Sequence, residues 1–222
     1  MTPPSSTQPA PIRIIDTGIA NTASVSAAFG RLGLAASLCE SPDEVREAAA
    51  VVLPGVGSFG AGIGRLRELG LVDAIKERIE ADRATLCVCL GLQLLGETSE
   101  ESPGAVGLGV APVAATHFPP GARTPQFGWN LVTPGAGFSL AEPGYAYFAN
   151  TYRLTELPVG WAGATSDHAG PFVASMRKGN VLACQFHPEL SGPWGLGLLA
   201  SWARECAGLE ARVPATGRAE AC

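Results

Sequence analysis

ATLCVCLGLQLLGETSEE, residues 84–101, is the stretch that decides the fold. It opens with a strand-like apolar run, residues 85–88, and continues through Cys89, Leu90 and Gly91 into a segment that looks like the first turns of a helix. A strand that breaks into a helix at a Cys, with a Gly close behind, has the geometry of a nucleophile elbow. The sharp turn exposes the thiol beside backbone N–H groups at the helix start, where partial positive charge favours a thiolate.

The same stretch allows two other interpretations. Cys89 can be a buried small hydrophobe, because free Cys is among the most buried residue types. Cys87 can be the nucleophile in its place, although only Cys89 is followed by Leu-Gly. A catalytic Cys89 therefore requires a base and an oxyanion site from elsewhere in the chain.

The residues before the elbow alternate between strand and helix patterns. Strands are predicted at 12–16, 34–38 and 50–53, and helices at 21–32, 41–49 and 63–82. This order predicts an α/β fold with a parallel sheet between two layers of helices. Sites in such sheets lie beyond the carboxyl ends of the strands, so we expect the loop Gly55-Val56-Gly57 to face Cys89. As a phosphate cradle this loop is a weak match, because it lacks the GxGxxG and GKS/T patterns.

The chain changes character after Glu101. Residues 103–144 are rich in Gly and Pro and predict a β-rich segment beside the parallel sheet. Further strands are predicted at 145–154, 161–166, 172–177 and 180–186, and a closing helix at 194–206.

The last predicted strand ends at His187-Pro188-Glu189. His187 can serve as the base for a nucleophilic thiol, and Glu189 can hold that base in the correct tautomer. Alternatively, His187 is a structural histidine. His117 and His168 lie in loop-like segments, where we expect them to be solvated or to meet a partner.

Composition limits the possible functions. The net charge of −5 over 222 residues gives no electrostatic case for a nucleic-acid or membrane-surface partner, and no apolar run is long enough to span a bilayer. The six Cys follow neither a disulfide nor a zinc-site spacing, so we expect a cytoplasmic protein without metal or cofactor. The predicted organisation is a disordered leader at 1–11, one domain at 12–206 and a disordered tail at 207–222.

Three segments resemble the signatures of class I (triad-type) glutamine amidotransferases: LPGVGSFG at 53–60, CLGLQLL at 89–95 and QFHPELS at 185–191. More narrowly, the chain resembles the glutaminase subunits of imidazole glycerol phosphate synthases over about residues 12–205. The stretches that carry this resemblance are IIDTGIANTASV (14–25), VVLPGVGSFG (51–60), SEE (99–101), FGWN (127–130), YFANTY (147–152) and HPELSGPWGLGLL (187–199). The resemblance implies a flavodoxin-like, doubly wound parallel sheet with an added β-rich segment.

The resemblance also implies hydrolysis of the side-chain amide of glutamine. Cys89 would attack the amide carbon, His187 would take the thiol proton and give it to the leaving ammonia, and Glu189 would orient His187. The oxyanion and the substrate would be met by Gly55, Val56, Gly57, Leu90, Gln93 and Glu101.

Family members of this kind work with a cyclase partner, so the resemblance implies a heterodimer with a (β/α)8 barrel that receives the ammonia. Several positions depart from the family pattern, among them Thr17 and Ala20-Asn21-Thr22, where Tyr and Gly-Asn-Leu are usual. Gln126 stands where His is usual, and Asn150-Thr151-Tyr152 stands where His-Ser-Tyr is usual. Three alternatives therefore stay open: a paralogous glutaminase subunit for a specialised amidation pathway, a cysteine hydrolase that does not use glutamine, and a non-catalytic binding subunit.

Overall fold

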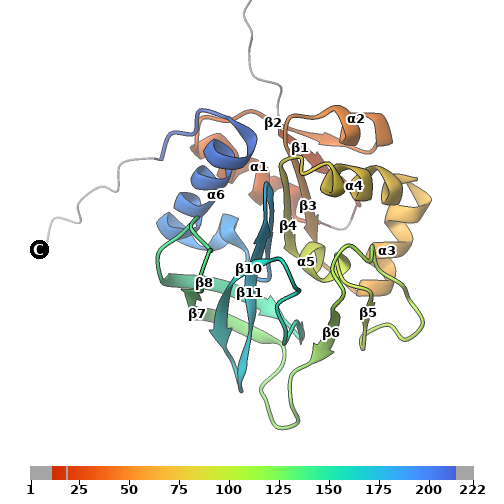
Figure 1. Ribbon diagram of the computed structural model, residues 1–222, viewed down its shortest axis with the longest axis vertical. Coiled ribbons are helices and arrows are strands. Elements are labelled where there is room, and N and C mark those ends of the chain that lie inside the picture. Colours follow the sequence, from red (N-terminus) through yellow and green to blue (C-terminus); the bar gives the residue numbers. More distant parts are fainter. Residues whose placement is uncertain (1–11, 19, 214–222) are drawn as a thin grey trace, which may run out of the picture.

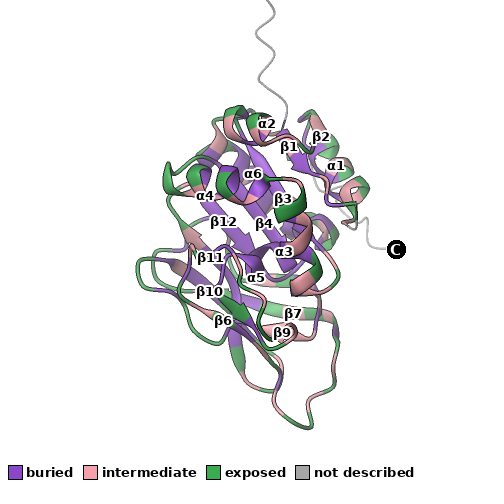
Figure 2. Ribbon diagram, turned by 90° about the vertical axis from the view of Figure 1, so that its right-hand side faces the viewer, coloured by how far each residue is buried: buried purple, intermediate pink, exposed green. Residues whose placement is uncertain are grey.

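The structure is a computed structural model that describes residues 12–18 and 20–213. Five parallel strands form one half of its main sheet: β1 (Ile12–Ile15), β2 (Ala36–Cys39), β3 (Val51–Gly55), β4 (Thr85–Cys89) and β12 (Val181–Cys184). They lie in the order β2-β1-β3-β4-β12 (Figure 1; β12 is labelled in Figure 2). With β12 as the fifth strand, this is the flavodoxin-like order 2-1-3-4-5, which confirms the predicted fold class.

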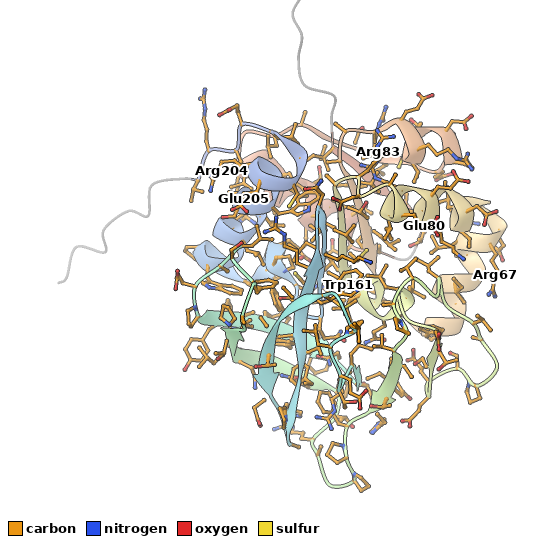
Figure 3. All side chains as sticks on the ribbon, viewed as in Figure 1. Arg67, Glu80, Arg83, Trp161, Arg204 and Glu205 are labelled. Carbon is orange, nitrogen blue, oxygen red and sulfur yellow. The ribbon has the colours of Figure 1, made fainter. Side chains whose placement is uncertain are left out.

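Helices cover both faces of this parallel half, because successive strand residues point to opposite faces. Leu86 of β4 belongs to an apolar cluster with residues of α1 (Thr22–Arg31) and α6 (Gly192–Ala207). Cys87, the next residue, belongs to a second cluster with residues of α2 (Pro42–Glu47) and of three further helices. The central strands β3, β4 and β12 are buried, the edge strand β2 is partly exposed, and charged side chains such as Glu80 and Glu205 lie on the outside (Figures 2 and 3).

The single helix predicted at 63–82 is wrong. The chain forms α3 (Phe59–Glu68) and α4 (Leu71–Glu80), separated at Gly70, whose φ is +68°. Glycine adopts this left-handed conformation without the steric cost of a Cβ atom, so it ends one helix and redirects the chain into the next. The apolar spacing continues across the break, which is why periodicity alone did not reveal it.

The β-rich segment extends the main sheet instead of packing beside it. Antiparallel strands continue from β12 in the order β11 (Pro171–Lys178), β10 (Ala162–Asp167), β7 (Gln126–Pro134) and β8 (Gly144–Asn150). A small second sheet contains β5 (Thr98–Ser99), β6 (Ala114–His117) and β9 (Tyr152–Arg153). The strand predicted at 145–154 is therefore divided at Thr151 between two sheets.

The C-terminal end of the described chain packs against the domain. Leu209 is buried in the cluster with α6, and the Arg212 backbone N–H donates to the Leu32 carbonyl at 2.9 Å. Residues 207–213 thus differ from the predicted disordered tail, while 214–222 and the leader 1–11 lie outside the described residues. Within the described chain, no helix is long and apolar enough to cross a membrane.

Candidate active site

The chain turns sharply at Cys89, between β4 and the short helix α5 (Leu90–Leu94). Cys89 has φ +54° and ψ −108°, a conformation that side-chain-bearing residues rarely adopt and that nucleophile elbows share. A Cβ atom on Gly91 would collide with the Leu53 carbonyl oxygen, and one on Gly55 would lie 2.7 Å from the Leu90 Cβ. Because these two residues lack a Cβ atom, the backbone of α5 can pack directly against the backbone at the end of β3. This close packing brings the 55–57 loop beside the thiol.

A pocket of about 180 Å³ opens at this edge of the sheet. It brings together most of the predicted site residues and is lined by Val56, Gly57, Cys89, Leu90, Gln93, Glu101, Ala149, Asn150, Thr151, Tyr152 and His187. Two predicted residues do not line it. Gly55 lies beneath Leu90, and Glu189 lies behind His187.

His187 reaches the pocket because β12 is the parallel neighbour of β4, with Cys184 in register with Val88. Both strands end at the same edge, so the residues that follow them meet. The 3-10 turn Pro188–Leu190 then carries Glu189 back toward the imidazole, where Oε1 lies 2.8 Å from His187 Nδ1. Both side chains are buried.

The electrostatics of this pair favour a charged imidazole. Burial by itself lowers the pKa of His187, but hydrogen bonding and charge interactions with Cys89 and Glu189 outweigh it and raise that pKa to about 10. The Glu189 carboxylate holds Nδ1 of the imidazole and leaves Nε2 free for proton transfer.

Gln185, a residue that the sequence reasoning missed, also lies next to the thiol. It is fully buried, and its Nε2 lies 3.8 Å from Cys89 Sγ. Its Oε1 accepts a hydrogen bond from Gln93 Nε2 at 3.0 Å, and the same Gln93 nitrogen donates to the Tyr152 carbonyl at 3.0 Å. In the sequence, this residue could have been noticed as a polar amide side chain within the otherwise apolar run that precedes His187.

Glu101 and Asn150 complete the wall of the pocket. One oxygen of Glu101, Oε2, accepts a hydrogen bond from the Phe59 backbone N–H at 2.6 Å, which ties the chain after the elbow to the start of α3. Asn150 donates through Nδ2 to the Tyr152 carbonyl at 3.0 Å. Its cross-strand partner Gln126 is buried beside it on the same face of the β7–β8 pair.

The other candidates for chemistry have structural positions. Cys87 is fully buried on the opposite face of β4, and burial raises its pKa to about 12, which disfavours a thiolate. The ring nitrogens of His117 and His168 lie 2.6 and 2.8 Å from the carbonyls of Phe118 and Arg123. Neither histidine lines the pocket with Cys89.

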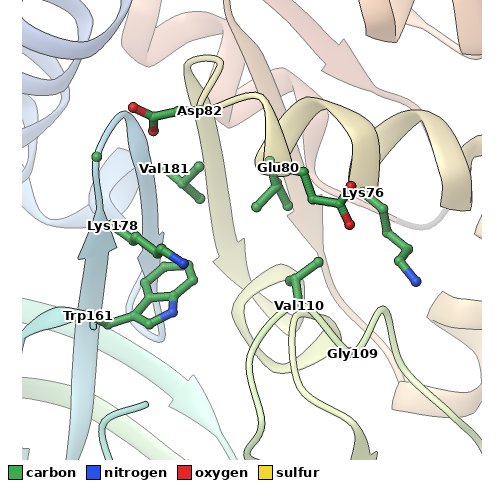
Figure 4. Close-up of a pocket in the computed structure, with 10 residues that line it drawn as sticks. Lys76, Glu80, Asp82, Gly109, Val110, Trp161, Lys178 and Val181 are labelled. Atoms are coloured by element: carbon green, nitrogen blue, oxygen red, sulfur yellow. The ribbon is translucent and has the colours of Figure 1, made fainter. Parts of the chain in front are cut away.

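A larger cavity, of about 410 Å³, lies at the opposite end of the parallel strands, where β12 begins at Val181. Its walls include Lys76, Glu80, Trp161 and Lys178 (Figure 4). It contains no thiol and no imidazole. We therefore assign the chemistry to the smaller pocket. Among the described residues, no cluster of three or more His, Cys, Asp or Glu side chains could hold a metal ion.

Comparisons with known proteins agree with this geometry. Residues 13–204 match the family model "Glutamine amidotransferase class-I". The chain is 37% identical over 209 residues to the imidazole glycerol phosphate synthase subunit HisH of Symbiobacterium thermophilum, covering 92% of this chain and 99% of that protein. It is 34% identical to the chloroplastic imidazole glycerol phosphate synthase hisHF of Arabidopsis thaliana, covering 96% of this chain and 36% of that protein. A crystal structure of a glutamine amidotransferase superimposes with a TM-score of 0.72 at 21% identity, covering 89% of this chain and 99% of that one.

Proposed function

Since this chain belongs to the class-I glutamine amidotransferase family, we propose that it is the glutaminase subunit of a cytoplasmic imidazole glycerol phosphate synthase, acting in histidine biosynthesis. It hydrolyses glutamine to glutamate and ammonia, and a cyclase subunit with a (β/α)8 barrel consumes the ammonia. The observation that carries this proposal is the pocket in which Cys89 and His187 meet, with Glu189 behind the imidazole.

In the proposed reaction, Cys89 Sγ attacks the carboxamide carbon of glutamine, and His187 holds the proton that the thiol has lost. Backbone N–H groups of Leu90 and of the 55–57 loop stabilise the oxyanion. Collapse of the tetrahedral intermediate breaks the C–N bond, and His187 gives its proton to the departing ammonia. His187 then takes a proton from water, which attacks the thioester and releases glutamate with the free thiol.

The proposal is tested by mixing the purified chain with the cyclase subunit of the same organism, glutamine and the cyclase substrate. We expect one glutamate for each imidazole glycerol phosphate formed, because the ammonia passes from one subunit to the other. Both products are measured by chromatography. Turnover of another amide without glutamate would instead support a cysteine hydrolase that does not use glutamine, and glutamate without the imidazole product would support a specialised pathway.

An exposed aromatic surface beside the pocket fits the docking of this partner. Alternate residues of β7, Phe127, Trp129 and Leu131, are 69, 54 and 46% exposed, and Tyr145 of β8, opposite Leu131, is 61% exposed. The far end of β8 reaches the pocket at Ala149 and Asn150. Contiguous exposed apolar side chains on a soluble domain mark an interaction site. We assign this surface, residues 127, 129, 131 and 145, to the cyclase interface.

Trp129→Ala is therefore expected to weaken the complex with the cyclase by about 30-fold in Kd, since an interface Trp at a hot spot contributes about 2 kcal/mol or more. Isothermal titration calorimetry gives this value. Val159→Ala is the matched control, because Val159 is 96% exposed but lies outside this surface. An unchanged Kd for Trp129→Ala would place the interface elsewhere.

A further inference from the structure

The hydrogen bonds that link Tyr152, Gln93, Gln185 and Cys89 have only one consistent direction. The Tyr152 carbonyl can only accept, so the group of Gln93 that faces it is the NH2 group. The same NH2 group also faces Gln185, which must accept through Oε1. The amide of Gln185 is thereby oriented, and its NH2 group points at Cys89 Sγ. Inverting either amide would place two donors or two acceptors face to face.

We propose that Gln185 is a catalytic residue whose NH2 group holds and stabilises the Cys89 thiolate, and that Gln93 sets the orientation of this donor. This role deepens the proposed glutaminase function. A hydrogen bond to the charged form of a group favours that form. The separation of 3.8 Å is long, but sulfur is a large and weak acceptor, and catalytic hydrogen bonds often tighten only when substrate binds.

Burial makes this donor more effective. Gln185 is fully buried and Gln93 is 5% exposed, so bulk water does not compete for the amide hydrogens. The Gln93 side chain also lines the pocket, where its own Oε1 is available to a substrate. Gln93 therefore connects the substrate pocket to the donor that faces the nucleophile.

The thiol has few charged neighbours. Besides Cys89, the titratable residues that line its pocket are His187, after β12, Glu101, after α5, and Tyr152, in β9. Glu189 lies behind His187. A change at Gln185 leaves all three carboxylate and imidazole groups in place, so its effect on the thiolate can be measured separately from theirs.

The test is the pH dependence of alkylation of Cys89 by iodoacetamide, followed by mass spectrometry with fragmentation to distinguish Cys89 from Cys87. In Gln185→Met, which introduces an apolar side chain of similar length, we expect the pH midpoint of the reaction to rise by about one unit, so that the rate at any pH well below the wild-type midpoint falls about 10-fold. Gln185→Glu is expected to shift the midpoint in the same direction, because it places an acceptor against the sulfur. Melting curves of both variants verify the fold.

Two further variants separate this role from a packing effect. Ser175→Ala changes another fully buried polar residue, on β11, and is expected to leave the alkylation profile unchanged. Gln93→Met is expected to shift the midpoint by less than Gln185→Met, and the double variant by no more than Gln185→Met alone, because both act on one donor. A wild-type profile in folded Gln185→Met would overturn the proposal even if glutamine hydrolysis is confirmed. A shifted profile would support it even if glutamine is not the substrate.

Discussion

Cys89→Ala is expected to abolish glutamine hydrolysis, with a fall in turnover of about 10⁴-fold or more, because no other group in the pocket can form the thioester. The cyclase complex of this variant is expected to keep its activity when ammonium salts replace glutamine. Ammonia supplied from solution bypasses the nucleophile, and the Ala side chain leaves the elbow without a new polar or charged group. Glutamate release and imidazole product are measured in parallel.

Cys87→Ala is the matched control for this experiment. Cys87 lies two residues away on the same strand, is fully buried, and faces the opposite apolar cluster. We expect it to lose some stability through the small cavity while turnover per folded molecule stays at the wild-type level. Glutamine hydrolysis that survives in Cys89→Ala and disappears in Cys87→Ala would reverse the assignment of the nucleophile.

Glu189→Gln is expected to lower glutamine turnover by about 10²–10⁴-fold at neutral pH, since the amide no longer fixes the tautomer of His187 or stabilises its charge. In the wild type the carboxylate lies 2.8 Å from Nδ1 and is buried with it. The substitution keeps the shape of the side chain, so partner binding and ammonium-dependent activity serve as controls. Wild-type turnover in this variant would remove Glu189 from the mechanism.

The same substitution has a signature in the pH dependence of stability. The pKa of His187 is raised from an ordinary value of 6.5 to about 10, so the folded protein retains a proton that the unfolded chain has lost. This contribution to stability is fully present below pH 6.5 and is lost as the pH rises to about 10. Melting temperatures between pH 6 and 10 are therefore expected to fall less steeply in Glu189→Gln than in the wild type.

Much of this site could be predicted because its parts are local in sequence. Cys89 ends β4, and His187 and Glu189 follow β12. Parallel strands deliver their carboxyl ends to one edge of the sheet. In the sequence, Gly55 follows a predicted strand and Gly91 follows the nucleophile by two residues. The structure shows that β3 and α5 approach so closely at these positions that only glycine fits. The alternation of strand and helix patterns predicted a parallel sheet covered by helices, and the resemblance to glutamine amidotransferases implied its flavodoxin-like arrangement.

The features that the sequence did not predict depend on contacts between residues that are far apart in the chain. The hydrogen bond from Gln185 to Cys89 spans 96 residues, and no local pattern indicates which way an amide will point. The division of residues 145–154 into β8 and β9 arises because each half pairs with a different strand. Similarly, the break at Gly70 is decided by how α3 and α4 pack on the sheet, since their apolar spacing is continuous.

The adjacency of β4 and β12 also has a consequence for biosynthesis. These strands are neighbours in the sheet, yet the ribosome makes them far apart in time. A nascent chain that has emerged as far as Asn180 already carries the nucleophile but has neither the amide donor of Gln185 nor the base. Long-range pairing of this kind forms late in folding. Premature termination or cleavage before β12 therefore gives a fragment that cannot release ammonia, and hydrolytic competence arises only after residues 181–189 have been made.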